Sequence, residues 1–305
     1  DIERNGPSRP VTFSSTSSGE EGVQRRITDT NGLTYMRAAR TVDVPYELYP
    51  YLSLFSDCLT NLGTEQKSMA DIEDLIKLKT GGLSSSISVH SSPIDLSPRI
   101  SFNFGGLSLN QNSQYIYDFW TDLLLNTNFN NKEKLATLIR LLSSNNIGSL
   151  AESGHVHARS YAAASMSQSK AVSEAINGID QLQFLNKLAK WTEDEASFQE
   201  KIIAPLTQLR DILVNSNNLR FSLISDKESV MENEKSIESL LSKLPSSSVP
   251  SDAYKTVDFP VKQDLYSIIK LPFQVSYASS VFKGVPYTHE DGPKLQVLSS
   301  LLTYK

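Results

Sequence analysis

The sequence has little cysteine, no long apolar run and no clustering of positive charge. Its 305 residues include one cysteine, Cys58, which excludes an internal disulfide and a four-cysteine metal site. No run of 18 apolar residues occurs, so the sequence predicts no membrane span. The formal charge is -5 and the basic residues are scattered, which argues against a nucleic-acid partner because phosphate contacts need clustered Lys and Arg. These absences leave an ordinary globular protein as the expected class.

The four histidines do not form a zinc-peptidase motif. His289 and Glu290 are followed by Asp-Gly-Pro, so the second histidine of H-E-x-x-H is absent, and the inverted motif H-x-x-E-H occurs nowhere. His155 and His157 would lie on different faces of a predicted helix, and His90 lies in a serine-rich strand without an acidic neighbour. We therefore assign no metal ligand and no metal cofactor to this chain.

Other catalytic motifs are also missing. The sequence contains no G-x-S-x-G elbow, no phosphate-binding loop and no dinucleotide-binding turn. Cys58 lies in a predicted helix, where a buried core residue is the simpler interpretation than a nucleophile. The sequence also contains an aromatic cluster, Tyr115, Tyr117, Phe119 and Trp120. This cluster could line a peptide pocket or pack in the core. The sequence thus predicts no catalytic residue and leaves the substrate-binding residues unknown.

Hydrophobic periodicity predicts an α+β fold in which helices pack on an antiparallel sheet. Alternation predicts strands at 33–39, 87–89, 100–104, 219–223 and 269–277. Helical spacing predicts helices at 45–62, 68–80, 112–126, 132–143 and 157–176, two segments within 180–214, one from Asp226 to Leu244, and one at 293–305. Pro205 is expected to kink or divide the second of the two segments within 180–214.

Composition divides the chain into four parts. Residues 1–31 are rich in Gly, Pro, Ser and charge, and predict a flexible lead-in. Residues 32–244 form the α+β unit, and 245–262 are a Pro- and Ser-rich linker. Residues 263–305 begin a second unit of the same type, whose last helix has no stop signal. We therefore expect an excised piece of a longer protein.

Three segments in order resemble the third domain of the presequence proteases, a branch of the pitrilysin and insulinase-like zinc peptidases. They are Asn31-Gly-Leu-Thr-Tyr-Met-Arg37, Leu59-Thr-Asn-Leu-Gly-Thr64 and Asp74-Leu-Ile-Lys-Leu-Lys-Thr-Gly-Gly82. The resemblance is diffuse over 112–244 and sharpens again at the linker and at 269–287, which resemble the entry to the family's fourth domain.

The resemblance implies a clamshell of two halves that encloses a chamber where peptides are cut. Zinc is held in the family by H-x-x-E-H and a glutamate in the N-terminal half, and this chain matches none of those positions. An arginine and a tyrosine that hold substrate lie in a motif beyond this chain's last helix. No metal or substrate-binding residue is therefore carried over.

Two functions follow as hypotheses. In the first, the chain is the non-catalytic C-terminal part of a zinc metalloendopeptidase in the mitochondrial matrix or intermembrane space. Its partners would be the N-terminal catalytic half and unfolded peptides, including cleaved targeting peptides. In the alternative, the chain belongs to a structural or assembly subunit of the same fold without peptidase activity, like the core subunits of a respiratory complex.

Overall fold

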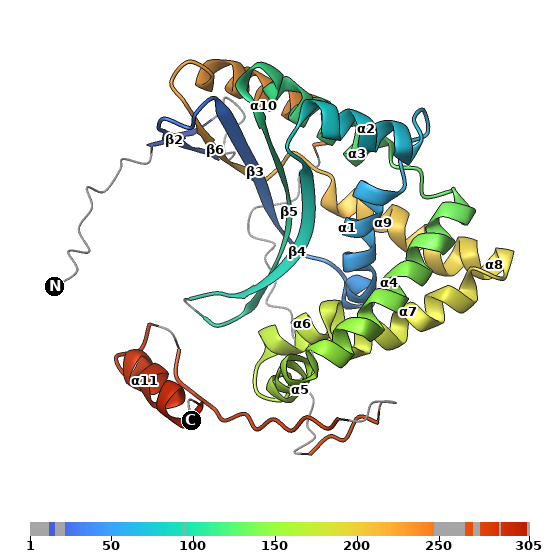
Figure 1. The fold of residues 1–305 in the computed structure, drawn as a ribbon, viewed down its shortest axis with the longest axis vertical. Coiled ribbons are helices and arrows are strands. Elements are labelled where there is room, and N and C mark those ends of the chain that lie inside the picture. The colour runs from blue at the N-terminus through green and yellow to red at the C-terminus, as the bar shows by residue number, and fades with distance from the viewer. Residues whose placement is uncertain are drawn as a thin grey trace.

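A computed structural model describes residues 12–15, 22–93, 95–246, 266–270, 275–286 and 288–303. The described strands form one six-stranded sheet in the order β1-β2-β6-β3-β5-β4, and helices pack on one of its faces (Figure 1). The strands are β1 (Thr12–Ser15), β2 (Gly22–Ile27), β3 (Leu33–Val42), β4 (Leu83–Ser91), β5 (Pro98–Leu109) and β6 (Leu219–Ser225). The predicted α+β class is confirmed, although the pair β2–β6 is parallel.

Helical segments fill most of the rest of the described chain. They are η1 (Tyr46–Tyr51), α1 (Leu52–Asn61), α2 (Met69–Lys79), η2 (Asn110–Asn112), α3 (Ser113–Asn126), α4 (Lys132–Glu152), α5 (Gly154–Ala163), α6 (Gln168–Asn177), α7 (Ile179–Trp191), α8 (Glu195–Phe198), the π-turn η3 (Gln199–Ile203), α9 (Ala204–Leu213), α10 (Val230–Lys243) and α11 (Gly292–Thr303). Most of the predicted helices are therefore present, with different bounds.

Local sequence signals explain where several elements begin. Asn31 and Gly32 both adopt positive φ, at 53° and 77°, and this turn leads into β3 as predicted. Ser68 begins α2, because its hydroxyl oxygen accepts a hydrogen bond from the backbone N–H of Asp71 at 3.2 Å. Gly63 ends the preceding segment at φ 82°, a backbone conformation that glycine adopts without strain.

The largest buried side chain of the core is Trp120, on α3. Its indole ring lies 5.0 Å from the ring of Phe104 on β5, and its Nε1–H donates to the carbonyl oxygen of Gly105 at 3.2 Å. Tyr117 on the same helix donates its hydroxyl proton to Asn233 of α10 at 2.8 Å. Trp120 therefore joins α3 to the sheet by apolar packing and a buried hydrogen bond, and Tyr117 joins α3 to α10.

Arg40 is buried on the helix-facing side of β3. Its guanidinium donates to the carbonyl oxygens of Ile212 at 2.5 Å and Asn217 at 2.8 Å. These carbonyls lie at and just after the end of α9, where helical carbonyls lack intrahelical partners. A cation also complements the negative end of the helix dipole, so Arg40 fastens α9 to the sheet.

The flexible lead-in predicted over 1–31 is wrong at Gly22–Ile27, which form β2. Val23 is buried in the core, and Arg25 forms an ion pair with Glu234 of α10. The segment looked like a linker because a strand at this position buries few side chains. It pairs with β1 on one side and with β6, almost 200 residues later, on the other, and a partner so distant cannot be recognised from local composition.

The helix predicted over 157–176 is also wrong, because two helices, α5 and α6, occupy this range. Ser165 donates its hydroxyl proton back to the carbonyl oxygen of Ala162 at 2.7 Å, which closes a turn after α5. Ser167 is extended and begins α6. Serines in a helix-like pattern compete for backbone groups, and here they divide the helix.

The division predicted at Pro205 is confirmed. Pro205 lies in the first turn of α9, directly after the π-turn η3. Proline has no N–H to donate to the carbonyl four residues earlier, that of Lys201. The hydroxyl of Tyr51 donates to this carbonyl oxygen instead, at 2.7 Å. The Tyr51 side chain of η1 thus provides the hydrogen bond that Pro205 cannot give to the Lys201 carbonyl oxygen.

The end of the chain differs from the prediction. The strand predicted at 269–277 is not formed in its described residues, 269–270 and 275–277, and neighbouring side chains such as Tyr266 and Ile268 are exposed. Alternation alone does not make a strand, because a strand also needs a neighbour for its hydrogen bonds. The helix predicted at 293–305 is present as α11, and most of the predicted linker, 247–262, lies outside the described residues.

Candidate functional site

The sheet has one face that the described helices do not cover, and we call it the open face (Figure 1). In β3 the side chains of Met36 and Ala38 point to the helices and are buried, while Arg37 between them is exposed. Arg37 lies opposite Gly105 of β5 and Ser222 of β6. The two-residue period of the strands therefore places one set of side chains in the core and the other on the open face.

The open face carries positive charge. Arg26, Arg37, Arg99 and Arg220 lie at positions of the strands that alternate with core residues, and the six strands contain no Asp or Glu. Arg99 is 3.7 Å from the carboxylate of Asp95, which lies in the β4–β5 connection. The remaining three are exposed, so this face attracts carboxylate and carbonyl oxygens.

Gly105 allows β3 and β5 to pair closely beside Arg37. A Cβ atom at Gly105 would lie 2.6 Å from the carbonyl oxygen of Met36 on the neighbouring strand, closer than such atoms approach in proteins. That atom would also lie 3.2 Å from the Cα atom and 3.3 Å from the Cγ atom of Arg37. The glycine therefore lets the neighbouring strand β3 approach closely, and Gly105 itself is buried.

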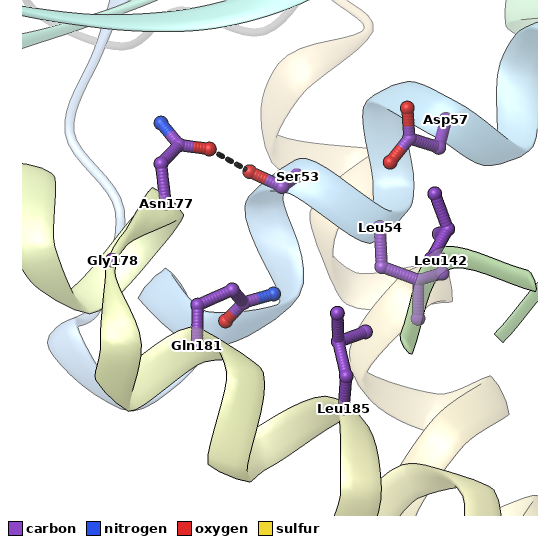
Figure 2. Close-up of a pocket in the computed structure, with 8 residues that line it drawn as sticks. All are labelled: Ser53, Leu54, Asp57, Leu142, Asn177, Gly178, Gln181 and Leu185. Atoms are coloured by element: carbon purple, nitrogen blue, oxygen red, sulfur yellow. Dashed lines mark hydrogen bonds between the residues drawn. The ribbon is translucent and has the colours of Figure 1, made fainter. Parts of the chain in front are cut away.

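A small cavity lies on the helical side of the molecule, between α1, α4 and α7 (Figure 2). Its volume is about 140 Å³. It is lined by Ser53, Leu54, Asp57, Leu142, Asn177, Gly178, Gln181 and Leu185. The Ser53 hydroxyl donates to Asn177 Oδ1 at 2.5 Å, and this bond joins α1 to the end of α6. None of these residues belongs to a motif that predicts a site from the sequence.

Asp57 supplies the charge of this cavity. Burial raises the pKa of its carboxyl group from 3.8 to about 6, because a low-dielectric environment disfavours the charged form. The neighbouring Cys58 is fully buried, and burial followed by the charge of Asp57 raises the pKa of its thiol. A thiol held protonated is a poor nucleophile, so the interpretation of Cys58 as a core residue is supported.

Replacing Asp57 with asparagine is expected to stabilise the chain at pH 7 by about 1–2 kcal/mol. The folded pKa is above the unfolded value, so the folded state loses stability as the pH rises from about 4 through about 6. Urea unfolding of both proteins at pH 4.5 and pH 7.5 measures this effect. The gain from Asp57→Asn should shrink at the lower pH, and an equal gain at both would contradict the assignment.

The structure keeps the histidines apart. His90 is on β4 and lies 3.0 Å from the Ser88 hydroxyl, and His155 and His157 are on α5. Burial lowers the pKa of His157, and His289 accepts a hydrogen bond from the backbone N–H of Asp291. Within the ranges that the structure describes, no three His, Cys, Asp or Glu side chains are grouped closely enough to hold a metal ion.

The aromatic cluster of α3 belongs mainly to the core. Tyr117, Phe119 and Trp120 are buried, so the reading as core packing applies to them. Tyr115 is the exception, with 36% of its surface exposed and the Lys79 ammonium 4.8 Å from its ring centre. The cluster is on the helical layer and does not form part of the open face.

Comparison with known families adds the deciding observation. A family model for the domain associated with peptidase family M16, subfamily C, matches residues 1–188. The chain belongs to this peptidase-associated family. It is 45% identical over 292 residues to "Presequence protease, mitochondrial" of Saccharomyces cerevisiae and 42% identical over 294 residues to the protein of that name in Kluyveromyces lactis. The resemblance predicted from the sequence is thus confirmed.

These alignments cover 94% of the peptidase-associated chain and 30% of each relative, so the chain spans about a third of their length. Solved structures share its fold. A conserved protein from Enterococcus faecalis has a TM-score of 0.54 at 12% identity, over 76% of this chain and 52% of that one. A protease from Helicobacter pylori has a TM-score of 0.51 at 9% identity, over 80% and 52%.

Proposed function

We propose that this chain is the non-catalytic C-terminal part of a mitochondrial zinc metalloendopeptidase that degrades targeting peptides and other short unfolded peptides inside a closed chamber. The observation that carries the proposal is the 45% identity to a protein named as a mitochondrial presequence protease, over nearly the whole chain. The same name on the next relatives favours a peptidase over the assembly-subunit alternative.

The zinc chemistry of such a peptidase would have to come from outside this chain. A catalytic zinc site needs three protein ligands and an open position for water. The histidines of this chain lie on β4, on α5 and before α11, and the two on α5 have no acidic or cysteine partner that completes a site among the described residues. These residues do not fit a zinc ion, so we derive no catalytic step from them.

The open face is the surface that we assign to the peptide chamber. It is the side of the sheet that the described helices leave uncovered, and Arg37 and Arg220 extend from it without an ion pair in the described part of the chain. Guanidinium groups bind carbonyl and carboxylate oxygens in a planar, two-donor geometry. An extended peptide would therefore present its backbone carbonyls and carboxyl end to this face.

The exposed arginines of the open face predict a difference in affinity between acidic and basic peptides. Targeting peptides are rich in arginine, so their basic side chains are expected to point away from the open face. The isolated chain should bind an unfolded acidic peptide more tightly than a basic peptide of equal length, and cleave neither. The double substitution of Arg37→Met and Arg220→Met should weaken binding of the acidic peptide about fivefold, since exposed charge pairs each contribute little.

Fluorescence anisotropy with labelled peptides measures this binding. Arg140→Met on α4 is the matched control, because it removes an exposed arginine from the helical side of the molecule. The control should bind like the original chain. Equal weakening by both sets of substitutions would mean that net charge alone attracts the peptide, and the open face would lose its assigned role.

A further inference from the structure

The cavity between α1 and α7 contains a buried amide without a partner. The side chain of Gln181 reaches from α7 toward α1 at the cavity (Figure 2), and only 4% of its surface is exposed. Neither its Nε2 nor its Oε1 has a hydrogen-bond partner in the described structure. Buried amides are almost always paired, because an unpaired amide loses its bonds to water without replacement. Within the described structure, Gln181 therefore has no acceptor for its Nε2–H groups and no donor for its Oε1 atom.

The carboxylate of Asp57 is a second polar group of the same cavity that lacks an ion-pair partner in the described chain. Asp57 lies on α1, four residues after Ser53, and also lines the cavity (Figure 2), and within the described chain no Lys, Arg or His forms an ion pair with it. Burial raises the pKa of this carboxyl group to about 6, which shows how poorly its charge is solvated. A buried carboxylate is stabilised most effectively by a cationic donor at hydrogen-bond distance.

We propose that this cavity binds a small molecule or chain end that carries a primary ammonium group next to a carbonyl oxygen. The ammonium donates to Asp57, and the carbonyl oxygen accepts from the Gln181 amide N–H. A second ligand N–H donates to Gln181 Oε1. The group lies against Leu54, Leu142 and Leu185, which form the apolar part of the lining. The N-terminal residue of a peptide and a free amino-acid amide share this chemistry.

Size and charge narrow the class of ligand. A volume of about 140 Å³ corresponds to about five water molecules, which suits one small residue and not a nucleotide or a sugar chain. The charge of Asp57 disfavours phosphate and carboxylate groups. A free amino acid is therefore a poorer ligand than its amide, because its own carboxylate would lie in the same small space.

Alaninamide is the probe that tests the proposal. Titration calorimetry at pH 7.5 with the whole chain should show saturable binding in the millimolar range, and alanine and N-acetylalaninamide should not bind. Asp57→Asn and Gln181→Met should each weaken alaninamide binding about tenfold or more, because each removes a buried hydrogen-bond partner of the ligand. Gln183→Met is the matched control, since Gln183 is exposed on the same helix, and it should bind like the original chain.

Three results would overturn the proposal. One is no binding of alaninamide to the original chain, which would leave a cavity that water alone fills. Another is equal binding of alaninamide and N-acetylalaninamide, because the ammonium would then contribute nothing. The last is unchanged affinity in Asp57→Asn, a neutral replacement of the same shape. The ligand series on the original chain decides the matter even if Gln181→Met does not fold.

The open face plays no part in this proposal. Failure of alaninamide binding would leave the peptide-binding role of Arg37 and Arg220 intact. In the same way, loss of that role would leave the cavity as an independent site on the helical side of the molecule.

Discussion

Substitution of Trp120 by alanine is expected to lower the free energy of unfolding by about 3–5 kcal/mol, enough to unfold a large fraction of an ordinary domain. The indole is fully buried between α3 and β5, in contact with Phe104. Its removal creates a cavity at the joint between the helical layer and the sheet. It also leaves the carbonyl oxygen of Gly105 without the indole N–H that donates to it.

Tyr115→Ala is the matched control, because Tyr115 is an aromatic residue of the same helix with 36% of its surface exposed. Its loss should cost much less than that of Trp120. Urea denaturation followed by circular dichroism measures both variants, and tryptophan fluorescence follows Trp191 in the Trp120 variant and both tryptophans in the control. Equal destabilisation by the two substitutions would contradict the placement of Trp120 at the centre of the core.

Much of the fold is predictable from local sequence. Asn31 and Gly32 predict the turn before β3, since only residues that tolerate positive φ fit there. Ser68 predicts the beginning of α2 through its side-chain oxygen. Such signals act within a few residues, so they are visible in one segment without knowledge of the rest of the chain.

The features that sequence analysis missed depend on distant partners. The strand β2 exists because β6 pairs with it, and the alternating segment at 269–277 is not a strand in its described residues because no described strand pairs with it. The cavity beside Asp57 is a similar case. Ser53 and Asn177, which form its edge, are 124 residues apart and meet only when α1 packs beside α6 and α7.

The sequence says little about site residues. Spacing excludes a zinc motif at His289, and the pattern names no substrate-binding residue. The positive open face was not predicted, because Arg37 and Arg40 look alike in the sequence. The pleat of β3 separates them, so that Arg40 fastens α9 to the sheet while Arg37 is exposed on the open face.

The second prediction with a large expected effect concerns peptide cleavage by the two parts of the proposed parent peptidase. The N-terminal part of the proposed parent peptidase, purified separately, is expected to bind zinc but to cleave peptides poorly, because one wall of the chamber is missing. Addition of this chain should raise cleavage at least about a hundredfold, since correct positioning of a substrate commonly contributes a factor of that size. Variants of the open face, Arg37→Met with Arg220→Met, should reconstitute less activity than Arg140→Met.

The reconstitution itself tests the central claim most directly. Cleavage of a fluorogenic unfolded peptide is measured for this chain alone, for the N-terminal part alone and for their mixture, with zinc content determined for each and circular dichroism confirming that both parts are folded. We predict that the chain alone holds no stoichiometric zinc and cleaves nothing, and that the mixture is active. Zinc-dependent cleavage by this chain alone, or an inactive mixture of two folded parts, would contradict the account.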